Sequence, residues 1–400
     1  MAIQVPENYT YLDWAATAPL SDAAAQAMEP FLRPGKANVA YGLNANSLHA
    51  PGRAAFEALE NARRQMARDL GCSRPNELVF TSGATEADNM ALLGIARALR
   101  DERRKRDGAG VRYRVITTEV EHEAVLEPAH ELAREGFDVQ YAKPGKDGFV
   151  TREAIEALLT DDTLLVSVQV ANSEIGTIHP LPELVEAAHE HGALFHADAT
   201  QALGKMPLDL GQLGVDAASF SAHKIGGPKG VGALYLKART PFRPLLLGGG
   251  QEDGRRSTTQ NVCGVVGFAA ACHEAVTLEE RESQRQRGLR DWLYAELRRM
   301  PGIRPTIEVP AGSREHLPNI VHALASAYES ETLVLRLDRA GFGVSGGSAC
   351  SSHSLEPSRV LKAIGVSTDE AYGALRVSLG RYTEEEDLRR FMSALSECLS

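Results

Sequence analysis

Short apolar segments alternate with helix-like segments through the first two-thirds of the chain, and this alternation limits the possible folds more than any other feature. Among the helix-like segments, PLPELVEAAHEHG (180–192) keeps its apolar residues at a helical spacing. Five segments have the length and composition of buried strands: ELVF (77–80), YRVIT (113–117), LLVSVQV (164–170), ALFHA (193–197) and AASFS (217–221). Strands that alternate with helices pair in parallel, and the helices cover both faces of their sheet. The sequence therefore predicts an α/β fold with a mostly parallel central sheet.

The composition is that of a large globular protein with an acidic balance of charge. The chain has 400 residues, 43% of them hydrophobic, and 43 basic against 53 acidic residues give a net charge of −10. This length suits one large domain with a smaller one, or two comparable domains, and the negative charge disfavours nucleic acid as a partner. No run of about 18 apolar residues predicts a membrane span, and the N-terminus lacks the pattern of a secretion signal. We therefore expect a cytoplasmic protein with no direct nucleic-acid or membrane partner.

The cysteines predict neither a disulfide framework nor a metal site. Their number is odd and no pair has a CxxC spacing, which suits a reducing cytosol. They are Cys72, Cys263, Cys272, Cys350 and Cys398. We expect no bound metal, and a cysteine with a function would act as a thiol.

The character of the sequence changes after about residue 262. A long helical region (262–300) leads into a smaller α+β part that contains a Gly/Ser-rich stretch, GFGVSGGSACSSHS. The predicted division is a large domain over 15–261 and a small C-terminal domain over 262–400. The N-terminal segment 1–14 is assigned to the small domain, which carries the Gly/Ser-rich loop 341–354.

A turn of small residues follows the first predicted strand. In TSGATEADN, Gly83 and Ala84 let a ligand approach the backbone, and the first N–H groups of the next helix, with Thr85, suit a phosphate. An ordinary strand-to-helix turn has the same composition, so this signal alone decides nothing. His122 follows the next strand, near a predicted helix start, and a lone histidine is more often structural than catalytic.

Polar side chains follow the later strands as well. Asp198 and Gln201 come after ALFHA, and Ser221, His223 and Lys224 come at the end of AASFS. The carboxyl ends of parallel strands lie at one edge of a sheet, where ligands bind in α/β proteins. An aspartate directly after a buried strand costs desolvation free energy unless it faces a cation or hydrogen-bond donors. We therefore expect these side chains to form one polar site.

Together these groups are what an enzyme dependent on pyridoxal 5′-phosphate (PLP) requires. A lysine condenses with the aldehyde of PLP, a carboxylate keeps the pyridine nitrogen protonated, and a helix start holds the phosphate. A free lysine, with a pKa of about 10.4, is a poor nucleophile at neutral pH, and a partly buried cationic site lowers that pKa. Lys224 is the lysine predicted to hold the aldehyde.

At this point the sequence resembles a known family, the cysteine desulfurases with the class-V aminotransferase fold. The resemblance extends from YLDWAATAPL (11–20) to LRVSLGRYTEEE (375–386). It is carried by five ordered motifs: FTSGATEADN, TEVEHEAVL, HADATQALGK, SFSAHKIGGPKGVGALY and GSACSSHSLEPSRVLKAIG. It implies the PLP-dependent fold of type I, PLP as cofactor and L-cysteine as substrate.

The resemblance also assigns roles to residues of this chain. His122 would stack on the pyridine ring and move protons, Asp198 would pair with the ring nitrogen, and Arg376 would bind the substrate carboxylate. Thr259, in GGGQEDGRRSTTQN, would reach the cofactor phosphate of the partner subunit in a homodimer. The full set implied for cofactor binding is Ala84, Thr85, His122, Asn172, Ser173, Asp198, Gln201, Ser221, His223, Lys224 and Thr259.

Two positions depart from the family pattern. The family has NNEIG where this chain has Asn172-Ser173-Glu174, and the second asparagine contacts the phenolic oxygen of the cofactor. A serine hydroxyl can also donate a hydrogen bond, over a shorter reach. The family's GNPSSLH is GLNANSLH here, one residue longer, and Asn44 is the residue assigned to substrate binding, with Asn46 beside it.

Cys350 selects the reaction among those that PLP supports. It lies in the Gly/Ser-rich loop, and loops of this composition often move during turnover. A cysteine thiolate near a cationic cofactor could attack the sulfur of bound cysteine, which would leave alanine and a persulfide on Cys350. His353 could assist. By resemblance, the long loop is of the iron–sulfur-cluster type and would carry the sulfur to an acceptor protein.

Two alternatives stay open at this stage. One is another PLP reaction on the same fold, such as that of a selenocysteine lyase, an aminotransferase or an epimerase. The other is a catalytically silent scaffold for sulfur relay, against which the complete set of Lys224, Asp198 and His122 argues.

Overall fold

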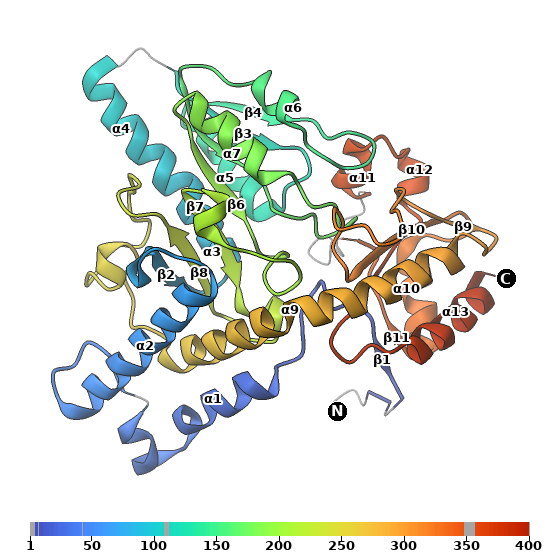
Figure 1. Ribbon diagram of the computed structural model, residues 1–400, viewed down its shortest axis with the longest axis horizontal. Helices are drawn as coiled ribbons and strands as arrows, with labels where there is room; N and C mark the ends of the chain where they lie inside the picture. Colours follow the sequence, from blue (N-terminus) through green and yellow to red (C-terminus); the bar gives the residue numbers. More distant parts are fainter. Residues whose placement is uncertain (1–4, 7, 42, 108–111, 348–356, 400) are drawn as a thin grey trace.

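A seven-stranded sheet forms the larger half of the molecule (Figure 1). The computed structural model describes residues 5–6, 8–41, 43–107, 112–347 and 357–399. The spatial order of the strands is β2-β8-β7-β6-β5-β3-β4, with β8 antiparallel to both neighbours and the other pairs parallel. Their bounds are β2 Leu78–Thr81, β3 Arg114–Thr118, β4 Asp138–Ala142, β5 Thr163–Ser167, β6 Leu194–Asp198, β7 Ala217–Ser221 and β8 Gly232–Leu236.

Helices cover both faces of this sheet. Successive residues of a strand point to opposite faces, and here they enter two different apolar clusters. Val79 and Val115 belong to one cluster, with α3, η3 and α5, whereas Phe80 and Ile116 belong to the other, with α2, α7 and α9. Each fully buried side chain of this size contributes about 1.5–3 kcal/mol to folding. The helices of this half are α1 Asp22–Leu32, η1 Gly35–Ala40, α2 Ala50–Asp69, η2 Pro75–Glu77, α3 Ala84–Asn89, η3 Met90–Ile95, α4 Ala96–Asp107, α5 Glu123–Arg134, α6 Arg152–Glu156, α7 Leu181–Glu190, α8 Leu210–Leu213, η4 Ala222–Ile225 and η5 Glu252–Gly254.

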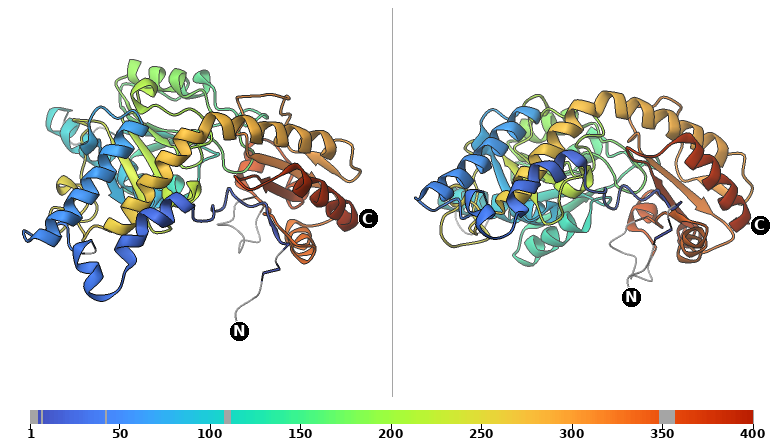
Figure 2. Two further views of the ribbon diagram at one scale, coloured as in Figure 1. Left: turned by 60° about the horizontal axis from the view of Figure 1, so that its bottom comes forward. Right: turned by 90° about the horizontal axis from the view of Figure 1, so that it is seen from below.

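One long helix, α9 (Val262–Leu297), extends from the larger half to the smaller half (Figures 1 and 2). At a rise of 1.5 Å per residue its 36 residues span roughly 54 Å. An 18-residue window of α9 is apolar enough to cross a membrane by length and composition, with a mean hydropathy of 1.3, and half of that window is buried inside the protein. Contacts with α1 and α2 explain this apolar composition, since α9 is a core helix of this fold.

The smaller half contains a three-stranded antiparallel sheet in the order β12-β10-β9. Its strands are β9 Ile303–Pro305, β10 Ile320–Ala325 and β12 Ala374–Ser378, and its helices are α10 Ser330–Arg339, α11 Arg359–Ala363, α12 Thr368–Ala371 and α13 Glu385–Leu399. The N-terminal strand β1 (Thr10–Tyr11) pairs in parallel with β11 (Phe342–Gly343). The segment after β1 then passes to the larger half, where Ala18 N donates a hydrogen bond to His223 O at 2.9 Å.

The predicted α/β fold with a mostly parallel sheet is confirmed, and so is the long helical region after residue 262. The five predicted strands are present as β2, β3, β5, β6 and β7; β7 has the predicted ends, and the ends of the other four shift by one to three residues. The division between residues 261 and 262 stays a prediction.

Candidate functional site

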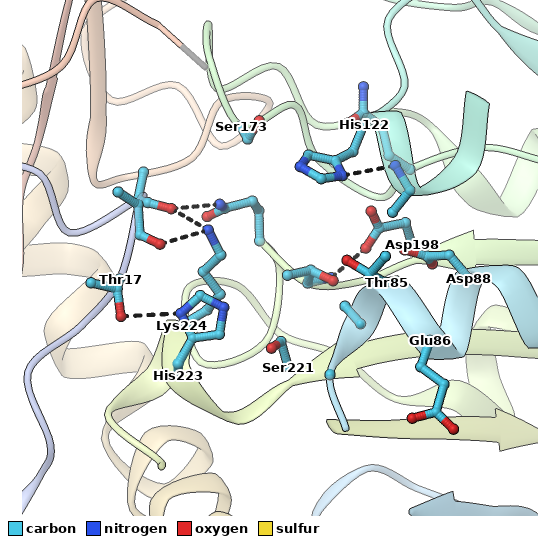
Figure 3. Close-up of a pocket in the computed structure, with 18 of the residues that line it drawn as sticks. Thr17, Thr85, Glu86, Asp88, His122, Ser173, Asp198, Ser221, His223 and Lys224 are labelled. Atoms are coloured by element: carbon cyan, nitrogen blue, oxygen red, sulfur yellow. Dashed lines mark hydrogen bonds between the residues drawn. The ribbon is translucent and has the colours of Figure 1, made fainter. Parts of the chain in front are cut away.

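A cavity of about 460 Å³ lies beyond the carboxyl ends of the parallel strands (Figure 3). It collects residues from the ends of β2, β6 and β7, from the start of α5, and from β12 of the smaller half. Ten of the fourteen predicted site residues line it: Ala84, Thr85, His122, Ser173, Asp198, Gln201, Ser221, His223, Lys224 and Arg376. The side chains that follow separate strands therefore do meet, as the alternating pattern predicts.

Lys224 extends from η4, directly after β7, and its amine points into the cavity (Figure 3). The Nζ atom donates hydrogen bonds to the carbonyl oxygens of Ala15, at 2.6 Å, and Ala16, at 3.0 Å. Gly226 ends η4 in the left-handed conformation, with φ of 83°, and lets the chain turn away behind the lysine. The N-terminal segment thus supplies the acceptors for an amine of the larger half.

Asp198 is the last residue of β6 and lies in the wall of the cavity, 8% exposed. One carboxylate oxygen accepts a hydrogen bond from Thr200 N at 2.9 Å. The other has no hydrogen-bond partner among the described residues. A buried carboxylate with an open acceptor is suited to bind a protonated ring nitrogen.

His122 lies on the far side of the cavity from Lys224 (Figure 3). It is the N-cap residue of α5, where its Nδ1 atom accepts a hydrogen bond from Ala124 N at 3.1 Å. An acceptor at Nδ1 places the proton of the neutral ring on Nε2. The cap therefore fixes both the position and the tautomer of this imidazole.

Hydroxyls and a helix start gather at another end of the cavity. Ser221 and His223 come from the end of β7, and Thr85 comes from the first turn of α3. Burial, together with the nearby amines of Lys224, Lys229 and Lys205, lowers the pKa of His223 to about 4, so this ring is neutral at pH 7. The unbonded N–H groups of a helix start and neutral donors are suited to hold a phosphate.

Arg376 of β12 reaches the cavity from the smaller half and is only 2% exposed. Its guanidinium donates to Ser173 O at 3.0 Å and to the carboxylate of Asp13 at 2.8 Å. Its Nε atom is buried and has no hydrogen-bond partner among the described residues. A buried donor with no partner is costly, so a ligand oxygen at this point would be stabilised.

Two further carboxyl groups, of Asp88 and Glu121, interact electrostatically with Asp198. Burial and the neighbouring Asp198 raise the pKa of Asp88 well above its usual range. Burial raises the pKa of Glu121 to about 8, although Gln169 N and the Thr118 hydroxyl donate to its oxygens. Burial therefore favours the protonated form of both carboxyl groups.

The structure does not bring every predicted residue into the cavity. The side chain of Asn172 bonds to backbone groups, donating to Val120 O at 3.1 Å and accepting from Glu174 N at 2.9 Å. Asn44 caps its own turn, accepting from Asn46 N at 2.9 Å, and Thr259 is exposed and does not line this cavity. Their roles in binding stay predictions. Cys350 and His353 lie outside the described residues.

Some residues of the site left no signal that we recognised in the sequence. Ala15 and Ala16 act through carbonyl oxygens, which every residue type has. Asp13, which pairs with Arg376, lies in the N-terminal segment, 363 residues earlier in the chain, where none of the five motifs contains it. Lys205 follows Gln201 by four residues and donates to its side chain at 2.7 Å, a helical spacing that could have indicated the contact.

Comparison with known proteins identifies the family. The profile of the aminotransferase class-V family matches residues 10–391. The chain belongs to the aminotransferase class-V family. A protein of Dictyoglomus turgidum named cysteine desulfurase IscS is 41% identical over 97% of this chain and 94% of its own length. The protein of that name from Klebsiella pneumoniae is 40% identical over 94% of this chain and 89% of its own length.

Solved structures agree with this assignment. A NifS-like protein superimposes with a TM-score of 0.87 at 37% identity, over 98% of this chain and 99% of the other. A protein named SspA, solved in complex with cysteine, gives a TM-score of 0.77 at 29% identity, over 94% and 100%. The resemblance to the desulfurases of this family is thereby confirmed.

Members of this family use PLP, and the cavity fits it. Its volume of about 460 Å³ lies within the common range of about 300–1,000 Å³ for cofactor sites. Lys224 offers an amine, Asp198 an open acceptor and the start of α3 a phosphate site, and a Cβ on Gly83 would approach the hydroxyl of Ser221 to 4.0 Å. The glycine thus keeps room where the phosphate would lie.

Proposed function

We propose that this protein is a cysteine desulfurase, a PLP-dependent transferase that takes sulfur from L-cysteine and leaves L-alanine. The observation that supports this proposal best is the meeting of Lys224, Asp198, His122 and Arg376 in one cavity. It occurs in a chain 41% identical to a protein named cysteine desulfurase. The released sulfur is held as a persulfide on Cys350.

Substrate orientation begins with Arg376. Its guanidinium is held by Asp13 and by Ser173 O, and its Nε–H is left without a partner. The carboxylate of L-cysteine binds at this donor through a charge-assisted hydrogen bond. The amino group and the Cα proton of the substrate then face the Lys224 side of the cavity.

Lys224 and His122 move protons. When bound, PLP withdraws electrons from the amino acid, so that the Cα proton and the β-sulfur become able to leave. The neutral amine of Lys224 takes the Cα proton. Asp198 holds a proton at the ring nitrogen, and His122, with its proton on Nε2, donates at the substrate on the opposite side.

Cys350 receives the sulfur. Its thiolate forms a sulfur–sulfur bond with the substrate sulfur as the carbon–sulfur bond breaks, and the electron pair of that bond stays with carbon. The carbon then takes up a proton and becomes the methyl group of alanine. The sulfur is oxidised and the carbon is reduced, so no external oxidant is needed.

The proposal extends to the sulfur acceptor of the protein and to its location in the cell. A sulfur-acceptor protein takes the persulfide sulfur for iron–sulfur cluster assembly or for another sulfur-containing product. The proposed location is the cytoplasm, whose reducing conditions suit a chain with an odd number of cysteines and no CxxC spacing. Neither a membrane nor nucleic acid is a direct partner.

The enzyme works as a homodimer in which Thr259 completes the partner's site. Thr259 is exposed and does not line the cavity of its own chain. Its neighbour Gln260 accepts a hydrogen bond from Asn46 at 2.9 Å, and Leu48, which follows Asn46 by two residues, is 91% exposed. An exposed apolar side chain beside an exposed polar segment supports a subunit contact at this surface.

The test is alanine formation from L-cysteine by wild type and by Cys350→Ser. The variant should bind PLP and L-cysteine but release no alanine, because a hydroxyl is a far weaker nucleophile toward sulfur than a thiolate. Mass spectrometry should find the added sulfur on the peptide that holds residue 350. Cys72→Ser, Cys263→Ser, Cys272→Ser and Cys398→Ser serve as matched controls and should keep the wild-type rate.

Continued alanine formation by Cys350→Ser would contradict the proposed sulfur transfer. A selenocysteine lyase, aminotransferase or epimerase reaction on the same fold would then take its place, and each would reveal itself by its own product.

A further inference from the structure

Lys205 is a second lysine close to the cavity, and the proposed reaction gives it no role. It is partly buried at the end of the turn that follows β6, and it lines a second cavity of about 80 Å³. Lys224 lines both this second cavity and the larger one. The two lysines therefore share the lining of the second cavity.

A chain of hydrogen bonds connects the two amines. Lys205 Nζ donates to Gln201 Oε1 at 2.7 Å, and Gln201 Nε2 donates to Ala15 O at 3.0 Å. Lys224 Nζ donates to that same carbonyl oxygen at 2.6 Å. One side-chain amide and one carbonyl group thus separate two groups that can both carry a positive charge.

The charges around Lys205 are mostly positive. Within the described residues no carboxylate forms a salt bridge with Lys205. Burial, and then the charges of Lys224 and Arg376, lower the pKa of Lys205 to about 7. Repulsion between two like charges acts on both, so a proton on Lys205 also disfavours a proton on Lys224.

The acidic groups of Glu282, Glu274 and Asp13 are already paired with arginines. Glu282 of α9 lines the second cavity but binds Arg285 at 2.9 Å, and Arg381 of the same cavity binds Glu274 at 2.7 Å. Asp13 binds Arg376. Asp198, His223 and Lys229 face Lys224 across the larger cavity.

We propose that Lys205 is a positioning residue whose positive charge, held against the Lys224 amine through Gln201, keeps the Lys224 nitrogen in its neutral form. The inference rests on the proposed function, in which Lys224 must be neutral to take a proton. When Lys224 is neutral, it no longer repels the positive charge of Lys205. If only one of the two amines is protonated, that amine is therefore Lys205. Lys205 acts through Lys224 and need not touch the substrate.

The test is a pH titration of the visible absorption of the holoenzyme. The absorption band of bound PLP changes when the Lys224 nitrogen loses its proton, so its midpoint reports that nitrogen directly. Lys205→Met should raise the midpoint by about one pH unit, as two charges less than about 10 Å apart would give in a partly buried site. Lys205→Arg keeps the charge and should leave the midpoint near that of wild type.

Controls separate charge from packing. Lys237→Met removes a surface lysine that pairs with Asp216, and should leave the midpoint unchanged. Lys205→Gln is a second neutral variant, and it replaces Lys205→Met in the comparison if the latter does not fold. The inference is overturned if a folded neutral variant titrates like wild type, or if Lys205→Arg shifts the midpoint as much as Lys205→Met.

A second readout does not depend on the cofactor. The full-length chain freed of PLP is labelled with fluorodinitrobenzene at pH 7, where a lysine with a pKa of about 7 still carries charge, and the peptide that holds Lys224 is followed by mass spectrometry. Lys205→Met should slow this labelling at least about threefold, because less of the Lys224 amine is neutral. Equal labelling rates for wild type and Lys205→Met would overturn the inference, whether or not the protein binds PLP. Failure of the wild type to bind PLP would count against the proposed function alone.

Discussion

At the scale of single residues, Asp198 is the carboxylate assigned to the ring nitrogen of PLP, and burial favours the protonated form of its neighbour Asp88. Asp198→Asn should leave PLP partly bound but slow turnover severely, because the ring nitrogen loses the charge that keeps its proton. Turnover and bound PLP are measured on the same preparation, with Asp161→Asn, an exposed carboxylate, as the control. A rate within about threefold of wild type, well under 1 kcal/mol, would exclude the assigned role.

Glu121 should make the protein less stable as the pH rises. Its pKa is raised from 4.5 to about 8 in the folded state, mainly by burial. A group with a raised pKa contributes stability below its unfolded pKa, and this contribution is lost as the pH rises through the folded value. Glu121→Gln should therefore gain stability relative to wild type between pH 5 and pH 8. Urea unfolding at both pH values measures this change, and a constant difference would contradict it.

His322 should show the opposite dependence on pH. Burial, and then the charge of Arg376, lower its pKa from 6.5 to about 3. Its contribution to stability is present above pH 6.5 and is lost as the pH falls toward 3. His322→Asn should therefore lose less stability than wild type between pH 7 and pH 5 in the same unfolding experiment. An equal or larger loss would show that this histidine is charged in the folded protein.

Individual site residues could be predicted where the side chain itself forms the site, and not where a backbone group does. Lys224 and Asp198 are polar residues placed directly after apolar strands, a contrast that the sequence displays without help from the structure. Asp88 lies among buried helix residues, and only the structure shows that His196 of β6 approaches its carboxylate at 3.6 Å while both oxygens lack a hydrogen-bond partner among the described residues. Asn172 has the expected location, but local backbone groups take up its amide.

At the scale of elements, Gly380 sets how closely the segment after β12 approaches the N-terminal segment. A Cβ at this position would come within 1.8 Å of the Trp14 ring, and Trp14 immediately precedes the carbonyls that bind Lys224. Gly380→Ala should lower stability by about 1–3 kcal/mol and weaken PLP binding, because Trp14 must move. Thermal unfolding and a PLP titration measure the two effects.

The matched control is Gly288→Ala in α9, where no atom lies within 4 Å of the added Cβ. This change should stabilise the protein by about 0.5–1 kcal/mol, since alanine favours a helix. If both variants behaved alike, close packing at Gly380 would not be the cause.

Strands were predictable as elements, and their ends less so. LLVSVQV reads as one strand over 164–170, but β5 ends at Ser167. The chain nevertheless keeps donating to β6 beyond this point, from Val168 N to His196 O and from Val170 N to Asp198 O. The apolar pattern therefore indicates that the chain stays buried beyond Ser167, but it does not indicate where the regular strand pairing of β5 ends. Strands β4 and β8 were not predicted, because β4 is only half-buried and β8 begins among glycines.

At the scale of the whole molecule, the proposed homodimer makes each site depend on two chains. Thr259→Glu should weaken PLP binding at least about tenfold, because its carboxylate repels the cofactor phosphate, and Lys224→Ala should be inactive. In a mixed dimer of these variants, one site carries both changes and the other carries neither. Mixing should therefore restore activity, up to about half the wild-type value per dimer.

Activity that stays absent after subunit exchange, verified by mass spectrometry of the intact mixed dimer, would show that Thr259 serves its own chain. Lys224→Ala mixed with Asp198→Asn is the control, because both residues line the cavity of one chain. In that mixture each site keeps one change, and no activity should return.

The arrangement of the whole molecule was the least predictable part. The alternating pattern predicts a parallel sheet, but the order β2-β8-β7-β6-β5-β3-β4 depends on contacts between segments far apart in the chain. Arg376 enters the cavity from β12, which follows the last strand of the large sheet by well over a hundred residues. Only the family resemblance predicted that Arg376 lies in this site, since no local sequence pattern connects Arg376 to Lys224.

The carbonyl groups of Ala15 and Ala16 have a consequence for how this enzyme can vary. They belong to the backbone, so replacing either alanine with another small residue leaves the acceptor for Lys224 in place. A survey of side-chain substitutions would record these positions as tolerant, although the cavity is built on them. Replacing the peptide bond with an ester, which makes the carbonyl oxygen a weaker acceptor, would expose the dependence. The side chains of Ala15 and Ala16 can therefore change during evolution while the hydrogen bonds to the Lys224 amine are kept.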